Sequence, residues 1–351
     1  MNIYDYAEHK GISIRQVSDF TSGVNPLGPS NKAKHAIRKS VKLLEFPPDK
    51  KIRYLKRYIC RQEMIGEDCI LFGQGSSSLI NNLLVAIKPN DVLLVSPVSK
   101  RYTDILHHYR MNVHLLHSEE KTHFEFKIDI ESAIERLKNI DMLILPNPHD
   151  VTGTMLNADN IAILSDVIEK TGKILVIDES YIEFTSQKSS IKQAVNAKNT
   201  VLIRTFSLFY TLLGMKIGYM AGSPEFLKRL SYNMSYEHIN TPACAAAIAS
   251  LKDKGFRKKS LKFIEEEKIY VINKLKGING LMIKDTSSNF ILIKIDAEMS
   301  GLENLFIRHN IIADTYKSES GGIFLRMPIK KHKQNAQFIK TLKYILKANP
   351  H

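Results

Sequence analysis

The chain of 351 residues contains no tryptophan, only three cysteines and no long run of apolar residues. A membrane-spanning helix needs roughly 18 or more consecutive apolar residues, and no stretch of the sequence approaches that length. The cysteines (Cys60, Cys69 and Cys244) are odd in number and far apart, so they indicate neither a disulfide framework nor a zinc site. The N-terminus lacks the basic and apolar segments of a signal peptide. We therefore expect a soluble, cytoplasmic protein.

Acidic residues are outnumbered, with 36 Asp and Glu against 50 Lys and Arg and a net charge of +14. Residues 32–61 hold eleven of the basic residues and two acids, and residues 327–351 hold six lysines and no acid. No helix-turn-helix, zinc-finger or RNA-binding pattern accompanies them. We interpret these segments first as solvated surface and next as an attraction for small anions. Nucleic-acid binding is the last alternative, and it would weaken steeply with salt.

What the sequence does contain is an alternation of short apolar runs with amphipathic segments. We expect strands at 69–72, 91–95, 113–116, 142–145, 174–177 and 201–204, and helices at 79–85, 128–138 and 161–169. Continuous apolar runs separated by helices predict a mostly parallel sheet that is buried on both faces.

The pattern changes near residue 236. A long charged helix (256–276) leads to strands at 289–293 and 321–326 and to a final helix at 335–346, which predicts a smaller α+β domain. The expected organisation is an N-terminal segment (1–45), a large domain (46–235) and a small C-terminal domain (236–351).

Polar residues follow several of the expected strands, at the sheet edge where ligands collect. The turn 73–78 opens a helix whose backbone N–H groups attract an anion, although glycine turns also serve structure alone. Asp178 ends the apolar run 174–177. Its carboxylate is suited to hold a protonated pyridine nitrogen, to coordinate a metal or to cap the next helix. Tyr181 is expected to point to the same side.

Eight motifs follow one another in a fixed order. They are Asn25-Pro26-Leu27-Gly28-Pro29, Gly75-Ser76-Ser77, residues 147–153, Asp178-Glu179-Ser180-Tyr181, Arg204-Thr205-Phe206-Ser207, residues 214–219, Asn289-Phe290 and Leu325-Arg326-Met327. This order resembles the fold-type-I, pyridoxal-phosphate-dependent aminotransferase superfamily. Within it, the motifs look most like those of histidinol-phosphate aminotransferases and threonine-phosphate decarboxylases. The resemblance implies a helix-covered, mostly parallel sheet, a smaller C-terminal domain and a homodimer.

The resemblance also implies roles for individual residues. Asp178 would pair with the pyridinium nitrogen of pyridoxal 5'-phosphate, which keeps the ring an electron sink. Arg326 would bind a substrate carboxylate through its fork, and Asn25 would lie near the substrate. The remaining cofactor-binding positions are Gly75, Ser76, Ser77, Ser207 and Lys216 for the phosphate, and Tyr181 and Asp150 for the phenolic oxygen.

The sequence departs from the family pattern at the position that matters most for catalysis. The Schiff-base lysine of the family follows the serine that is Ser207 here, and this position is Leu208. Leucine cannot form an imine or move a proton. Four further departures go the same way: Ser99 replaces an aromatic ring, Asp150 an asparagine, Lys216 an arginine and Phe46 a tyrosine.

Two main hypotheses follow. One is an atypical aminotransferase- or decarboxylase-like protein that binds a small anionic ligand, with pyridoxal phosphate bound noncovalently or absent. Tyr181, Tyr210 or His149 would then be the available bases. The other is a catalytically inactive, dimeric binding or regulatory protein on the same fold. A conventional enzyme in which Leu208 is an artificial replacement is a third alternative. No metal is expected.

Overall fold

The computed structural model describes residues 3–49, 52–121, 124–233, 239–296, 299, 301–318 and 322–348. Contacts within the chain divide it into two compact units. One unit comprises residues 28–119 and 127–256, and the other comprises residues 1–27, 120–126 and 257–351. We call them the large unit and the small unit and describe each by itself. None of the described helices is long and apolar enough to cross a membrane.

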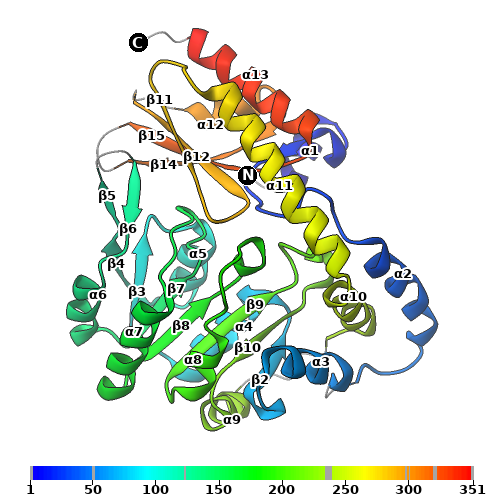
Figure 1. Ribbon diagram of the computed structural model, residues 1–351, viewed down its shortest axis with the longest axis vertical. Coiled ribbons are helices and arrows are strands. Elements are labelled where there is room, and N and C mark those ends of the chain that lie inside the picture. Colours follow the sequence, from blue (N-terminus) through cyan, green and yellow to red (C-terminus); the bar gives the residue numbers. More distant parts are fainter. Residues whose placement is uncertain are drawn as a thin grey trace. The chain divides into compact units, whose positions relative to one another are not determined.

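The large unit is built on a seven-stranded sheet (Figure 1). In spatial order its strands are β2 (Ile70–Gly73), β10 (Gly218–Ala221), β9 (Thr200–Thr205), β8 (Ile174–Asp178), β7 (Met142–Pro146), β3 (Asp91–Ser96) and β4 (Asn112–His117). β10 runs antiparallel to both of its neighbours, and all the other described pairs are parallel. The expected mostly parallel sheet is confirmed, and β10 is a strand that the sequence pattern does not predict.

Helices cover both faces of this sheet. On one face, α4 (Gly75–Ile87), α5 (Lys100–His108) and α9 (Pro224–Asn233) share an apolar cluster with alternate strand residues such as Leu94, Ile144 and Val176. On the other face, α7 (Ala158–Thr171) packs on β8 and β9, with α6 (Ile130–Arg136) and α8 (Ile191–Asn196) beside it. The intervening residues, among them Leu93 and Leu175, are also buried. Both faces of the strands are therefore apolar, which explains the continuous apolar runs.

Three further helices belong to the large unit. α2 (Asn31–Ser40) packs along α10 (Thr241–Leu251), and α10 also contacts α3 (Arg53–Glu63). Small buried residues of α10, Ala243, Ala246 and Ala247, permit this close approach.

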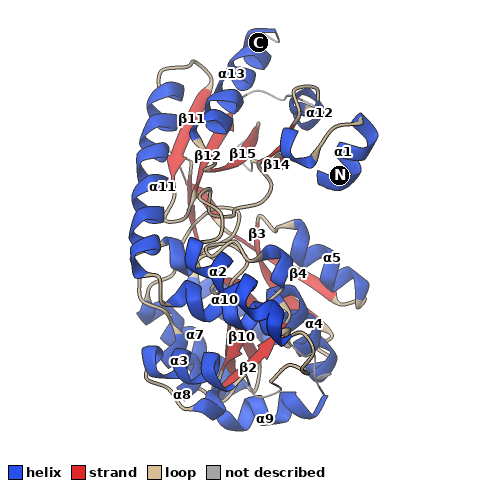
Figure 2. Ribbon diagram, turned by 90° about the vertical axis from the view of Figure 1, so that its right-hand side faces the viewer, coloured by secondary structure: helices blue, strands red, loops and turns tan. Residues whose placement is uncertain are grey.

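The small unit contains a four-stranded antiparallel sheet in the order β11 (Leu281–Asp285), β12 (Phe290–Ile295), β15 (Ile323–Pro328) and β14 (Asp314–Lys317). Figures 1 and 2 show α11 (Lys254–Leu275) and α13 (His332–Ala348) side by side along one face of this sheet. The remaining elements are α1 (Ile3–Lys10), α12 (Leu302–Ile307), the pair β1 (Ser18–Asp19) and β13 (Ile311–Ile312), and the pair β5 (Glu119–Lys121) and β6 (Glu125–Lys127). The expected α+β character of the C-terminal region is confirmed. Gly321, where we expected the second strand to begin, lies outside the described residues.

Candidate functional site

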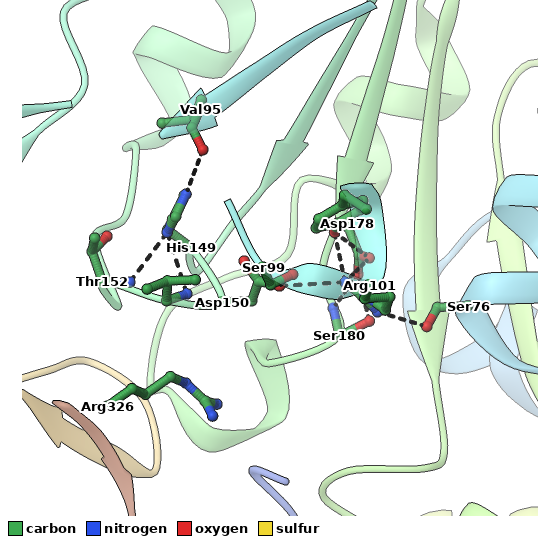
Figure 3. A network of polar contacts seen from close by, with 12 residues as sticks. Ser76, Val95, Ser99, Arg101, His149, Asp150, Thr152, Asp178, Ser180 and Arg326 are labelled. Carbon is green, nitrogen blue, oxygen red and sulfur yellow. Dashed lines mark hydrogen bonds and ion pairs between the residues drawn. The ribbon is translucent and has the colours of Figure 1, made fainter. Parts of the chain in front are cut away.

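A polar cluster lies where β7 and β8 end and where α4 and α5 begin (Figure 3). Its centre is Asp178, the last residue of β8, which is only 1% exposed. The Oδ1 atom accepts hydrogen bonds from the backbone N–H of Ser180 (2.8 Å) and from the Ser180 hydroxyl. The Oδ2 atom accepts from Arg101 Nη2 (2.8 Å) and from the Tyr102 hydroxyl (2.8 Å). A carboxylate offers about four acceptor positions, so the protein itself saturates Asp178.

Arg101 is the cation of this cluster, and sequence reasoning missed it. Besides Asp178, its guanidinium donates to the Tyr102 hydroxyl (2.6 Å) and, through Nη1, to Ser76 Oγ (3.0 Å). It also forms an ion pair with Asp150 at 3.8 Å. Burial opposes its charge, but Tyr102, Asp178 and Asp150 raise the pKa of Arg101 further above its usual value. The guanidinium therefore stays charged at every pH at which the protein is folded.

We call the turn that begins α4 the anion cradle, because its backbone N–H groups would attract an anion. Gly75 begins this 13-residue helix, has φ of +84° and lies close to Ser207, because a Cβ atom added to it would be 4.0 Å from Ser207 Oγ. Gln74 makes no side-chain cap hydrogen bond, so the helix N-terminus presents N–H groups and the positive end of its dipole. Ser76 is buried and Ser77 is exposed. The structure thus brings Gly75, Ser76 and Ser207 together at the start of α4, and their role toward a phosphate stays a prediction.

Gly218 holds this cradle against the sheet. It pairs with Gly73 on one side and Thr205 on the other. A Cβ atom at Gly218 would lie 2.7 Å from the carbonyl oxygen of Arg204 and 3.2 Å from the Cα atom of Gly75. Only glycine permits the two backbones to approach so closely.

Two predicted positions lie in the connection from β9 to β10. Leu208 is partly buried in the bend that follows β9. Lys216 has an exposed side chain and a left-handed backbone with φ of +46°. Its ammonium group makes no ion pair among the described residues. Leu208 contributes no polar group to the cluster.

Asp150 and Ser99 are bonded to each other. The Ser99 hydroxyl donates to Asp150 Oδ2 at 2.6 Å, and Asp150 is 8% exposed. The serine therefore supplies a hydrogen bond at the position where the family pattern has an aromatic ring. Arg101 Nη2 lies 3.8 Å from the same Oδ2 atom, so Asp150 is part of the same charged cluster.

His149 positions the loop beside this cluster. Its Nε2 atom contacts the carbonyl oxygen of Val95 (3.1 Å), and its Nδ1 atom accepts from the backbone N–H groups of Val151 (3.3 Å) and Thr152 (3.2 Å). A carbonyl oxygen only accepts, so Nε2 carries the proton and Nδ1 does not. Burial lowers the pKa of His149. Both nitrogens are used by the backbone, so the imidazole is not placed to act as a base.

The two candidate tyrosines are both buried at 7% exposure. Tyr181 packs its ring 6.0 Å from that of Phe184, and its hydroxyl is one of the groups that raise the pKa of Arg101. Tyr181 therefore lies within electrostatic range of the charged cluster. Tyr210 packs its ring against Phe206 (5.4 Å) and Phe209 (5.2 Å).

The two predicted substrate-binding residues belong to the small unit. Arg326 on β15 donates to the Thr21 carbonyl (3.1 Å) and lies 4.3 Å from the centre of the Phe290 ring. Asn25 donates to Ser260 Oγ (2.9 Å) and accepts from the backbone N–H of Leu27 (3.0 Å). Within this unit, both side chains have structural partners.

A second buried charge cluster in the large unit was not predicted. Arg204 on β9 pairs with Glu63 (2.8 Å), Glu179 (3.1 Å) and Glu183 (3.8 Å) and donates to the Tyr219 hydroxyl (3.2 Å). Burial raises the pKa of Glu179, and Arg204 opposes that effect. The Glu179 carboxylate also accepts from the Ser189 hydroxyl and the Ser190 N–H, at 2.6 Å each. These bonds fix the turn that follows Asp178.

Comparisons with known proteins agree with the motif order. The family model described as aminotransferase class I and II matches residues 15–340. The histidinol-phosphate aminotransferase of Methanosphaera stadtmanae is 26% identical over 350 residues, 97% of this chain and 94% of the relative.

Solved structures show the same fold. Histidinol-phosphate aminotransferase from Sinorhizobium meliloti, in complex with pyridoxal-5'-phosphate, superposes with a TM-score of 0.88 at 18% identity and covers 99% of this chain and 95% of that one. L-threonine-O-3-phosphate decarboxylase from Porphyromonas gingivalis has a TM-score of 0.77 at 19% identity and covers 94% and 100%. Because both structures are less than 25% identical to this chain, their similarity to it supports the fold alone.

Proposed function

The chain belongs to the class I and II aminotransferase family, and from that premise we propose that it binds a small anionic ligand without lysine-dependent pyridoxal phosphate chemistry. The ligand class is an amino acid or a phosphorylated amino acid. The observation that carries the proposal is Leu208, which follows Ser207 in the bend after β9. No amine stands there to form an imine or to move the α-proton.

Residues suited to an anion remain. Gly75, Ser76 and Ser207 surround the N-terminus of α4, where phosphate groups bind readily. Lys216 adds a positive charge to the loop that follows Ser207. Arg326 offers a fork suited to a carboxylate. These are the positions that the family uses for its phosphate and carboxylate groups, so they support an anionic ligand.

The residues present do not fit pyridoxal phosphate. When bound, this cofactor supplies an electron sink for amino-acid chemistry, and its ring nitrogen needs an acidic partner. Asp178 is the candidate partner, but its four hydrogen bonds all come from Ser180, Arg101 and Tyr102. The amine that would hold the cofactor covalently is absent at Leu208. We therefore propose that this site binds an anion, and we propose no reaction step that depends on the cofactor.

A second candidate function is an atypical enzyme. Tyr181 supports it, since this buried tyrosine interacts electrostatically with Arg101 and carries a hydroxyl, a group that can transfer a proton. The departures at Ser99, Asp150 and Leu208 favour the first candidate, a binding or regulatory protein. In both versions we propose a cytoplasmic homodimer.

The proposal is tested by titrating the protein with pyridoxal phosphate, reducing with borohydride and mapping adducts by peptide mass. We expect no stoichiometric adduct and no change in cofactor absorbance, because position 208 has no amine. Calorimetry with O-phosphothreonine, histidinol phosphate and inorganic phosphate is expected to show binding of at least one. Scattered, substoichiometric labelling of exposed lysines serves as the background. A one-to-one adduct on a single lysine, such as Lys216, or a failure to bind any of the three anions, would contradict the proposal.

A further inference from the structure

We infer that Arg101 has replaced the cofactor in this protein: its guanidinium pairs with Asp178 in place of a pyridine ring and meets the anionic ligand directly. This inference rests on the proposed function and names the residue that takes over the site.

The first support is the reach of the Arg101 side chain. It donates to Asp178 at 2.8 Å and to Ser76 at 3.0 Å. By resemblance these two residues serve opposite ends of the cofactor, the ring nitrogen and the phosphate. One guanidinium bonded to both occupies the space between them, as Figure 3 shows. A ring could bind to Asp178 only after Arg101 had left both partners.

The second support is charge. Asp178 is buried to 1% exposure, and a buried carboxylate needs a cation or several donors close by. A protonated ring nitrogen is one solution, and the guanidinium found here is another. Arginine is charged at all accessible pH values, so the pair with Asp178 does not depend on protonation of a ligand.

The third support is that the surrounding residues fit a guanidinium better than an aromatic ring. Ser99 and Asp150 are bonded to each other, and Asp150 lies 3.8 Å from Arg101. Tyr102 accepts a hydrogen bond from Arg101 and places its ring 4.5 Å from the guanidinium carbon. Hydroxyl, carboxylate and aromatic face are the usual partners of arginine.

Arg101 also retains donors for a ligand. Its five N–H groups include three with acceptors here, Asp178, Tyr102 and Ser76. Among the described residues, Nε–H and one Nη1–H have no hydrogen-bond acceptor, and 26% of the side chain is exposed. Together with the Ser76 hydroxyl, these donors suit a phosphate monoester or a carboxylate. The ligand therefore binds to the protein itself, without an intervening cofactor.

The test compares Arg101→Met with Lys100→Met, a matched change at the exposed neighbouring residue. For the wild type and Lys100→Met we expect binding of inorganic phosphate or O-phosphothreonine by calorimetry, and no pyridoxal phosphate by equilibrium dialysis. Arg101→Met is expected to bind the anion about tenfold or more weakly, since a charged hydrogen bond is lost. The same variant is expected to gain noncovalent pyridoxal phosphate, because Asp178 becomes available to a ring nitrogen.

A second pair of variants provides a spectroscopic readout. The double variant Arg101→Met/Leu208→Lys is expected to form an imine that borohydride fixes at position 208, whereas Leu208→Lys alone is not. If Arg101→Met loses its circular dichroism or thermal transition, Arg101→Gln, which keeps a donor without the charge, takes its place.

Three results would overturn the inference: no gain of pyridoxal phosphate in the Arg101 variant, unchanged anion affinity, or an imine in Leu208→Lys as abundant as in the double variant. A stoichiometric adduct in the wild type is a different failure, because it contradicts the proposed function itself.

Discussion

Lys330, in the small unit, is a lysine whose charge the fold disfavours. It is 7% exposed, and its Nζ atom donates to the Ser22 carbonyl at 2.6 Å. Burial lowers the pKa of Lys330 from 10.5 to about 8, with Asp19 acting in the opposite direction. Between these two pH values the unfolded chain binds a proton that the folded protein does not. Unfolding is then favoured by protonation, so stability must rise as the pH rises through this interval.

We therefore predict that Lys330→Met removes this pH dependence. Relative to the variant, the wild type should gain about 3 kcal/mol of unfolding free energy across the whole interval, because one pKa unit corresponds to about 1.4 kcal/mol. Loss of the hydrogen bond to Ser22 adds an offset that does not vary with pH. The measurement is urea unfolding at several pH values from 8 upward. Lys331→Met, at an exposed position, serves as the control, and parallel curves for wild type and Lys330→Met would refute the prediction.

Single residues differ in how far the sequence reveals them. Asp178 was predictable, because a carboxylate directly after an apolar parallel strand has to lie at the edge of the sheet. Arg101 was not, because an arginine in the first turn of an amphipathic helix is normally solvated. Its direction is set by Asp178 and Ser76, which are distant in sequence. The only available signal was the loss of the aromatic residue at Ser99, which leaves room for another side chain.

At the scale of elements, Gly218 couples β10 to the anion cradle. A Cβ atom there would lie 2.7 Å from a β9 carbonyl oxygen and 3.2 Å from Gly75 Cα. Both are backbone atoms, so neither can move away without shifting the strand or helix to which it belongs. We predict that Gly218→Ala lowers the unfolding free energy by about 1–3 kcal/mol, the usual effect of overpacking. Gly214→Ala is the matched control in the same connection, since no atom lies within 4 Å of its added Cβ. Denaturant unfolding of both variants decides the matter, and equal midpoints would show that the two strands can separate.

Strands that are buried on both faces were predictable from the sequence pattern. Strands that are defined only by their pairing with other strands were not. The strands β3, β7, β8 and β9 lie where continuous apolar runs predict them, because such runs have few alternatives in a helix-covered sheet. β10 reads Gly-Tyr-Met-Ala, too short and too mixed to indicate a strand. It is defined by its antiparallel hydrogen bonding to β2 on one side and β9 on the other. The short pair β5 and β6 likewise depends on partners rather than on pattern.

At the scale of the whole molecule, the segment after α2 exposes several apolar side chains, and their contact with water is unfavourable in a monomer. Val41, Leu43, Leu44 and Phe46 are between 47% and 63% exposed. The expected partner is a second copy of the chain, as the family resemblance implies. The same region is rich in lysine and arginine, so two copies would repel each other electrostatically while their apolar side chains attract.

We predict by light scattering that the wild type is a dimer and that the double variant Leu44→Lys/Phe46→Lys is a monomer at the same concentration. The substitutions remove apolar contact area and add charge to a surface that is already basic. Tyr344→Lys, at a 61% exposed aromatic residue outside this segment, should leave the dimer intact. The dependence on salt distinguishes this association from nucleic-acid binding. Salt screens the repulsion between the basic copies, so the dimer should become stronger or stay unchanged as the salt concentration rises. The affinity for nucleic acid would instead fall steeply. A wild type that is monomeric at all salt concentrations would contradict the homodimer and leave the exposed apolar segment to a different partner.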